Sequence, residues 1–275
     1  MYNTDARTLQ RMAPMMQRVV IIDPAPASAR LLTDLLREIC PCQVWQAPDA
    51  VRGMAVVGQV NPHIIFVEQN AAVDGAGFTR KLRRGDLACR RAPVIMVTSE
   101  ATAAIILGAR DAGVHEFLRK PYTAKDLMRR LEAVTLRSRD WVEAVNYVGP
   151  DRRRFNSGDY SGPLKRGSDT TTTPEGRIIQ SLKILKAAVA AIDVDPKQAL
   201  RAMLAQATEL QAAAKTLGDV QLRAAAIQLH QKLGAANVQA LNKADLQNSL
   251  ADIWKLAPAE AGKGEEPRKD NAAAA

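Results

Sequence analysis

The chain has 275 residues, 47% of them hydrophobic but only 4% aromatic, so it is long enough for one or two domains with cores of aliphatic side chains. Its formal net charge of +9 favours acidic partners without indicating nucleic acid, because a solvated basic surface gives the same charge. The apolar runs are far shorter than the roughly 18 residues of a membrane span, and the start of the chain lacks a signal-peptide core. We therefore expect a soluble, cytoplasmic protein with no membrane partner.

The three cysteines show neither a metal-ligand pattern nor a disulfide framework. Cys40 and Cys42 are separated by one residue only, and Cys89 stands alone. We expect reduced, partly buried thiols and no metal site.

The first half of the chain alternates between two kinds of hydrophobic pattern. Residues 1–17 show no clear period and are expected to form a leader, with at most a frayed helical turn. Short apolar runs predict buried strands at 18–22, 43–46, 63–69, 93–98 and 116–120. Segments with helical spacing predict helices at 28–39, 50–57, 78–87, 101–112 and 124–136. This alternation predicts an α/β fold in which both faces of a parallel sheet are covered by helices.

Polar residues stand where four of these strands end. The first strand ends at Asp23 and the third at Glu68, while the fourth ends at Thr98 and the fifth at Lys120. In an open parallel sheet, ligands bind at the carboxyl ends of the strands. We therefore expect these four side chains to share one site.

With these residues in this order, residues 18–138 resemble the CheY-like receiver domain of bacterial two-component response regulators. The resemblance implies a flavodoxin-like, doubly wound, five-stranded parallel sheet. It assigns Asp23 to the first metal-binding acid, Glu68 to the phosphoacceptor position and Thr98 to the hydroxyl. Lys120, followed by proline, takes the position of the family's lysine, and Phe117 that of its aromatic switch residue.

Two departures from the family pattern affect the chemistry. The second metal-binding acid of the family is Pro24 here, and the phosphorylatable aspartate is Glu68. Mg²⁺ needs near-octahedral oxygen ligation, which Asp23 and Glu68 offer only in part. We therefore expect impaired Mg²⁺ binding, no cofactor and no enzymatic activity. The extra methylene of Glu68 also displaces its carboxylate by about an ångström, and misplacement on that scale costs roughly a hundredfold in rate.

Three interpretations of Glu68 remain open. Its carboxylate can imitate a phosphorylated aspartate by reaching toward Lys120 and Thr98 in charge-assisted contacts. Alternatively, it only pairs with Lys120 inside an inert scaffold. The third interpretation, phosphorylation of Glu68 in a phosphorelay, is disfavoured by the loss of the metal-binding acid.

Residues 139–172 mix aromatic and basic residues with glycine and proline, which predicts a linker without regular structure. Basic residues near aromatic side chains can bind a phosphate and stack on a base. The segment is loosely similar to the arginine-rich segments through which some receiver-like proteins bind cyclic dinucleotides, so a cyclic-dinucleotide effector is the alternative function. A solvated, extended linker is the competing interpretation. The candidate binding residues are Arg152, Arg153, Arg154, Lys165 and Arg166.

Residues 173–256 are rich in alanine, leucine, glutamine and lysine and show four amphipathic segments, with start signals at Thr173, Asp195 and Asn242 and a break at Gly218-Asp219. Short connections make neighbouring helices antiparallel, so we expect an all-α four-helix bundle. Its alanine-rich core is thin, which favours self-association through an exposed seam. Residues 257–275 have no apolar face and are expected to be disordered.

His230 lies in a segment that resembles the His-x-x-Lys-Gly motif of histidine phosphotransfer domains. However, Lys232 stands one place too early for that motif, and only one helix follows where the family has two. Phosphotransfer through His230 is therefore a second phosphorelay hypothesis. The competing interpretation is a half-exposed histidine that packs beside the bundle core.

The sequence as a whole predicts a signalling protein with a degenerate receiver domain that works without phosphorylation. It would act through contacts with other signalling proteins, and the family resemblance implies a docking surface within residues 101–136. DNA binding is not expected, because the C-terminal helices lack a concentrated basic recognition face.

Overall fold

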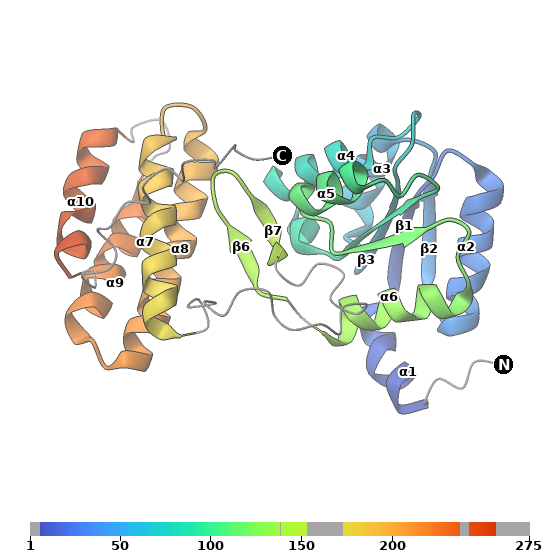
Figure 1. The fold of residues 1–275 in the computed structure, drawn as a ribbon, viewed down its shortest axis with the longest axis horizontal. Coiled ribbons are helices and arrows are strands. Elements are labelled where there is room, and N and C mark those ends of the chain that lie inside the picture. Colours follow the sequence, from blue (N-terminus) through green and yellow to red (C-terminus); the bar gives the residue numbers. More distant parts are fainter. Residues whose placement is uncertain (1–5, 138, 153–172, 237–241, 257–275) are drawn as a thin grey trace, which may run out of the picture. The chain divides into compact units, whose positions relative to one another are not determined.

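The structure, a computed structural model, describes residues 6–137, 139–152, 173–236 and 242–256 (Figure 1). The chain divides into two compact units. The first contains residues 1–142 and 146–163, and the second contains residues 143–145 and 164–275. Among the described helices, none is long and apolar enough to cross a membrane.

A five-stranded parallel sheet forms the centre of the first unit (Figure 1). The strand order is β2-β1-β3-β4-β5, which is the flavodoxin-like, doubly wound order. Every residue of β3 and β4 is buried, which explains their uninterrupted apolar runs. The predicted fold is therefore confirmed. The strands are β1 (Arg18–Ile22), β2 (Gln43–Ala47), β3 (Ile64–Glu68), β4 (Val94–Thr98) and β5 (Glu116–Arg119).

Helices cover both faces of this sheet. Side chains of α2 and α6 share one core cluster with β1, β3 and β4, whereas α3, α4 and α5 contribute to the cluster on the opposite face. A 3₁₀ turn, η2 (Ala88–Arg91), precedes β4. The helices are α2 (Pro26–Ile39), α3 (Ala50–Val60), α4 (Gly75–Arg84), α5 (Ala103–Ala112) and α6 (Ala124–Leu136).

Side-chain caps fix where these helices begin. The Asp49 carboxylate accepts a hydrogen bond from the Arg52 amide at the start of α3, and Thr123 and Asp126 form a reciprocal capping box at the start of α6. Helix α4 starts three residues before the predicted boundary, because Asp74 caps it by accepting from the Gly77 amide.

The described part of the expected leader is more regular than the sequence predicted. Residues Ala6–Met12 form α1, and Ala13–Met15 form the 3₁₀ turn η1. Met12 and Met16 are fully buried in the core cluster that also contains side chains of α6. Flexible methionine side chains fill irregular gaps in a core, so they can anchor a segment without a regular apolar stripe.

The expectation of an irregular linker was wrong at its beginning. Strands β6 (Trp141–Glu143) and β7 (Val148–Pro150) pair as a two-stranded sheet. Between them, Tyr147 is buried and its hydroxyl donates a hydrogen bond to the Pro150 carbonyl oxygen at 2.5 Å. A Cβ atom on Gly149 would lie 2.7 Å from the Gly113 Cα, so this approach requires glycine. Most of the predicted linker, residues 153–172, lies outside the described residues.

Arg83 of α4 fixes the surroundings of this hairpin within the first unit. It is 1% exposed, and its guanidinium donates hydrogen bonds to the backbone carbonyls of Arg90, Ala92 and Gly113. The Trp141 ring lies 5.4 Å from the Arg83 guanidinium carbon, within cation–π distance. Burial lowers the pKa of Arg83 to about 9.

In its described residues, the second unit contains four helices whose buried side chains form one core, as predicted. Each of them begins at a side-chain cap. The sequence indicated helix starts at Thr173, Asp195 and Asn242, and the structure adds Asp219 as a fourth cap. The same unit contains buried Glu143, whose side chain accepts a hydrogen bond from Gln198 and whose carbonyl accepts one from Gln206. The helices are α7 (Pro174–Ala190), α8 (Pro196–Leu217), α9 (Val220–Ala235) and α10 (Lys243–Lys255).

Candidate functional site

Four polar side chains lie at the carboxyl-terminal edge of the five-stranded sheet. Glu68 and Thr98 are the last residues of β3 and β4, while Asp23 and Lys120 directly follow β1 and β5. Parallel strands end at the same edge, so residues that are up to 97 positions apart in the sequence meet there. The structure brings Asp23, Glu68 and Lys120 into direct contact.

Lys120 lies between the two carboxylates. Its ammonium nitrogen Nζ is 2.5 Å from Glu68 Oε2 and 3.0 Å from Asp23 Oδ2. Both acids are buried, with side chains 3% and 7% exposed for Glu68 and Asp23, and the lysine side chain is 24% exposed. Two charge-assisted hydrogen bonds from one ammonium therefore occupy an oxygen atom of each acid.

Folding raises the pKa of Glu68 and of Lys120 but lowers that of Asp23. Burial raises the pKa of Glu68 and the Asp23 charge adds to this rise, whereas the Lys120 contact opposes it. Burial also acts to raise the pKa of Asp23, but hydrogen bonds from the Ala25 amide, Ser28 and Lys120 outweigh it and hold the pKa below its ordinary value. Burial alone would lower the pKa of Lys120, but the two carboxylates raise it. The ammonium is thus held in its charged form.

Thr98 does not make the contact expected from the sequence. Its hydroxyl donates a hydrogen bond to the Gln69 carbonyl oxygen at 2.6 Å and accepts one from the Glu100 amide at 3.1 Å. The hydroxyl therefore ties together the loops that follow β3 and β4. The prediction that Glu68 reaches both Lys120 and Thr98 was right for the lysine and wrong for the threonine.

The loop after Glu68 is fixed by local hydrogen bonds. The Gln69 side-chain oxygen accepts from the Ala76 amide, and the Asn70 side-chain oxygen accepts from the Val73 amide. A Cβ atom on Gly75 would lie 2.5 Å from the Glu68 carbonyl oxygen, so only glycine allows this approach. This packing holds the backbone of Glu68 in place.

Phe117, the predicted switch aromatic, lies in β5 and is 5% exposed. It belongs to the core cluster formed with α3, α4 and α5. The structure therefore shows the ring in a buried position.

Sequence reasoning missed two side chains near the charged groups. Ser28 is the first residue of the predicted helix 28–39, and its hydroxyl contacts the Asp23 carboxylate. Tyr122 is partly buried, its burial raises the pKa of its phenol, and it feels the charges of Lys120, Asp23 and Glu68. Its position two residues after Lys120 was the only sequence signal that could have indicated it.

Two further candidates lie in the described residues, Arg152 and His230, and neither joins this site. Arg152 pairs with Asp111 at 3.0 Å and stacks on the Tyr147 ring at 4.4 Å. His230 is half-buried on α9 of the second unit. The other predicted anion-binding residues, Arg153, Arg154, Lys165 and Arg166, lie outside the described residues.

Comparison with known proteins identifies the class. Residues 19–132 match the family model of the response regulator receiver domain. A match to the DNA-binding dual master transcriptional regulator RpaA of Synechocystis is 31% identical over 124 residues, which are 45% of this chain and about half (51%) of that protein. A probable chemotaxis protein CheY of Rhizobium etli is 28% identical over 118 residues, which are 42% of this chain and 91% of that protein.

Among solved structures, the chemotaxis protein CheY4 of Vibrio cholerae matches with 21% identity and a TM-score of 0.40, covering 43% of this chain and 98% of that one. The family-model match alone identifies residues 19–132 as a response regulator receiver domain. Receiver domains are signalling modules and not typically enzymes.

Receiver domains normally bind Mg²⁺ at this edge of the sheet. The donor set here consists of two carboxylates, each with one oxygen bonded to the Lys120 ammonium. Pro24, at the position of the second acid, has no side-chain oxygen. In the part of the chain that the structure describes, no group of three or more His, Cys, Asp or Glu side chains is arranged to bind a metal ion. The site therefore offers fewer side-chain oxygen ligands for the near-octahedral shell of Mg²⁺ than the family pattern does.

Proposed function

We propose that this chain is a signalling protein whose receiver domain works without phosphorylation and acts through contacts with other signalling proteins. One observation carries the proposal: the Lys120 ammonium bridges the Glu68 and Asp23 carboxylates at 2.5 and 3.0 Å. In this arrangement a permanent ion pair takes the place of a charge that phosphorylation would add.

The chemistry of the site supports this proposal. Phosphoryl transfer depends on positioning and on a metal ion that neutralises the developing charge. Pro24 removes a carboxylate ligand, and the ligands that remain are paired with a cation. We therefore propose that Mg²⁺ binding is impaired. The carboxylate of Glu68 also stands about an ångström beyond the position of an aspartate, a displacement that costs roughly a hundredfold in rate.

Two versions of the proposal differ in what the ion pair does. In the first, Glu68 imitates a phosphorylated aspartate, and its contact with Lys120 supports this version. In the second, the pair only stabilises the scaffold, and the bonding of Thr98 to Gln69 instead of Glu68 supports that version. Both versions share the same prediction, which is that signalling does not depend on a phosphodonor.

The test is labelling of the unmodified chain by a small phosphodonor in the presence of Mg²⁺. The matched control is the double variant Pro24→Asp and Glu68→Asp, which restores the acids of the family pattern. We expect no phosphorylated species of the unmodified chain by intact-protein mass spectrometry. Robust labelling of the unmodified chain would refute the proposal.

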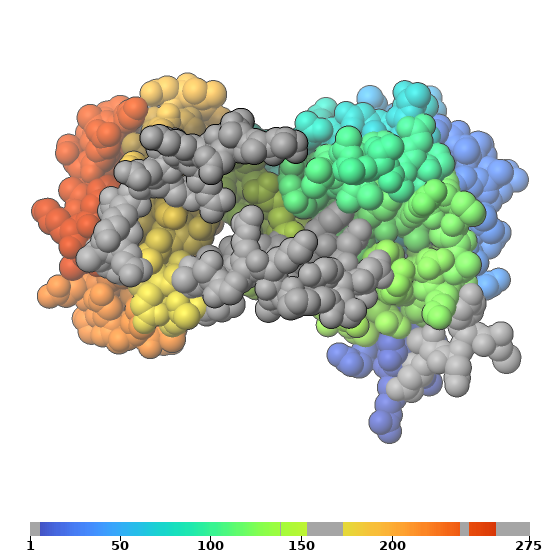
Figure 2. Space-filling view, in the orientation of Figure 1, coloured from blue at the N-terminus to red at the C-terminus, as the bar shows by residue number. Residues whose placement is uncertain are grey.

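The surface for protein contact is predicted within residues 101–136. Helix α5 lies in this range, and its outer side faces solvent on the face shown in Figure 2. Leu107 on this helix is 48% exposed. The identity of the partner, self-association through the helical unit and a cytoplasmic location stay predictions.

Cyclic-dinucleotide binding is the alternative function, and no described contact favours it. Arg152 already pairs with Asp111 and stacks on Tyr147, so it would have to exchange these contacts for a ligand. Titration with cyclic di-GMP, beside the variant Arg153→Ala, decides the point. Saturable binding at micromolar concentrations that the substitution abolishes would establish this alternative.

The two phosphorelay hypotheses have separate tests. The phosphodonor experiment described above tests phosphorylation of Glu68. For His230, the measurement is detection of phosphohistidine after incubation with a histidine kinase and ATP, with His230→Gln as the control.

A further inference from the structure

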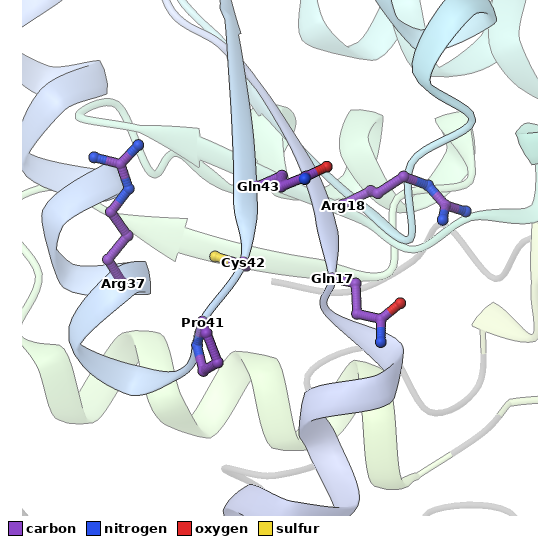
Figure 3. Close-up of a pocket in the computed structure, with 6 residues that line it drawn as sticks. All are labelled: Gln17, Arg18, Arg37, Pro41, Cys42 and Gln43. Carbon is purple, nitrogen blue, oxygen red and sulfur yellow. The ribbon is translucent and has the colours of Figure 1, made fainter.

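Residues 139–142 and 146–152 lie against the amino-terminal end of β5 within the first unit, and we call them the clamp segment. They follow α6, include most of the hairpin β6–β7, and lie beyond residues 19–132, which match the receiver family. At the same edge of the sheet, β1 and β2 begin beside an open pocket of about 550 Å³ whose lining includes Arg18 and Gln43 (Figure 3). This edge is thus open at β1 and β2 but contacted by the clamp segment at β5.

A direct backbone contact joins the clamp segment to the end of α5. Helix α5 ends at Gly113, which is buried and has a φ of +89°. A Cβ atom on Gly113 would lie 2.5 Å from the Val148 carbonyl oxygen, and one on Gly149 would lie 2.7 Å from the Gly113 Cα. The two glycines therefore face each other, and neither position has room for a side chain.

Arg83 holds the same point from inside the first unit. Its Nε donates a hydrogen bond to the Gly113 carbonyl oxygen at 3.1 Å, and its guanidinium carbon lies 5.4 Å from the Trp141 ring of the clamp segment. The guanidinium carbon of Arg91 also lies 5.4 Å from that ring. One buried cation therefore contacts both the end of α5 and the clamp segment.

Charged side chains of the clamp segment reach α5 and β5 on either side of the glycine contact. Arg152 Nη1 is 3.0 Å from Asp111 Oδ1 in the last turn of α5. Arg139 donates a hydrogen bond to the His115 carbonyl oxygen and lies 3.8 Å from the carboxylate of Glu116, the first residue of β5. The clamp segment is therefore bonded both to the end of the helix and to the start of the next strand.

Helix α5 is consequently anchored at both ends. The Thr102 hydroxyl caps its start by accepting a hydrogen bond from the Ile105 amide at 3.3 Å, and the clamp segment holds its end. Lys120 of the charged site follows the other end of β5, so the clamp segment acts from the opposite edge of the sheet. Between the two anchors, Leu107 is exposed on the surface that is predicted to contact partners.

We propose that the clamp segment holds α5 and the start of β5 in one arrangement, so that the docking surface needs no signal from the charged site. This role rests on the proposed function, in which α5 contacts a signalling protein. A surface that switches must populate a second arrangement, and contacts made in only one arrangement shift the population toward it. The buried contacts of Gly149 and Arg83 supply this bias. The Arg152–Asp111 pair, whose side chains are 46% and 50% exposed, is the part that opens most easily.

The first test is amide hydrogen exchange of the native full-length chain, read by mass spectrometry of peptides from α5 and α2. Gly149→Ala places a methyl group against Gly113. We expect exchange in the last turn of α5 to become about tenfold faster in this variant, while exchange in α2 is unchanged. Unchanged exchange in α5, or an equal increase in α2, would overturn the proposal.

The second test uses the exposed ion pair, which can be changed without disturbing a buried site. Arg152→Glu should make exchange in the last turn of α5 roughly twofold to fivefold faster. Adding Asp111→Arg to this variant should bring the rate back toward that of the unmodified chain. The matched control is Arg52→Glu, which removes an exposed pair with Asp49 on α3 and should leave α5 unchanged.

Exchange that stays as fast in the double variant as in Arg152→Glu alone would overturn the proposal, because the charge pair would then not hold the helix end. Phosphodonor labelling reports on the proposed function separately. Labelling of the unmodified chain refutes that function, whereas unchanged exchange in the variants refutes the clamp alone.

Discussion

At the scale of single residues, Lys120 determines the character of the charged site. Its ammonium holds two buried carboxylates that would otherwise repel each other at short distance. Removing one partner of a buried ion pair leaves an uncompensated charge, which is more costly than the pair is stabilising. The stability of the first unit should therefore depend on Lys120.

We expect Lys120→Met to lower the free energy of unfolding by about 3 kcal/mol at pH 7. Chemical denaturation measures this change, and repeating it at lower pH tests the cause. Because the folded-state pKa of Glu68 is raised, Glu68 becomes neutral first as the pH falls, and the loss should shrink. If the loss of unfolding free energy stays constant as the pH falls to the ordinary pKa of a glutamate, the ion pair is not the cause of that loss.

Glu68→Gln should change the pH dependence of the free energy of unfolding more than the size of that free energy. A glutamate whose pKa is raised on folding destabilises the folded state as the pH rises through that pKa. The amide has no such titration, so the variant should lack this decline while Lys120 keeps its contact with Asp23. Asp23 acts in the opposite direction: its lowered pKa gives stability that is lost only as the pH falls through the folded-state value. Denaturation curves across the acidic range distinguish the two groups.

At the scale of elements, the structure shows two segments that are more ordered than the sequence predicted. Leu9, Met12 and Met16 stand at helical spacing, but so short a run predicts no more than a frayed helical turn. In the hairpin, the glycines and prolines that suggested a linker provide the close contact of Gly149 with Gly113. Both errors arose because tertiary packing, not local pattern, decides these segments.

Met12→Ala should therefore destabilise the first unit by about 2 to 4 kcal/mol, because it empties a fully buried site. The matched control is Met15→Ala. Because Met15 is 49% exposed, this substitution should lower the free energy of unfolding by less than about 0.5 kcal/mol. Thermal or chemical denaturation of both variants gives the comparison. Equal effects would show that α1 is not part of the core.

Arg83→Lys should destabilise the chain by about 2 kcal/mol even though the charge is kept. Lysine lacks the planar fork that donates to several backbone carbonyls at once, and each lost bond to a charged group leaves a buried polar atom unpaired. Arg80→Lys on the exposed side of α4 is the control and should have little effect. Faster amide exchange of the β6–β7 hairpin in Arg83→Lys alone would link the loss to this segment.

At the scale of the whole molecule, the α/β and all-α units were predictable because their signals are local and repeated. Buried strands appear as apolar runs, and caps such as Asp195 and Asn242 mark helix starts. The strand ends placed Asp23, Glu68 and Lys120 together in advance. The orientation of Thr98 was not predictable, because it depends on where the Gln69 carbonyl lies after folding.

Arg83 is a second example of a position that sequence patterns do not predict. It is one of four basic residues within five positions of α4. Its spacing places it on the same helix face as Phe78 and Leu82, but an arginine at such a position is rarely fully buried. Only the folded structure shows which guanidinium lies among the carbonyls. The same holds for Tyr122, whose place beside the charged groups follows from the path of the chain after β5.

Lys120 holds the two carboxylates of the receiver site in an ion pair, and we propose that this pair leaves no place for Mg²⁺. The most direct measurement is calorimetric titration of the full chain with Mg²⁺ at pH 7, beside the double variant Pro24→Asp and Glu68→Asp. The claim predicts no saturable binding by the unmodified chain at millimolar Mg²⁺ and a measurable gain in the variant. Saturable millimolar binding by the unmodified chain, weakened by Asp23→Asn, would contradict it.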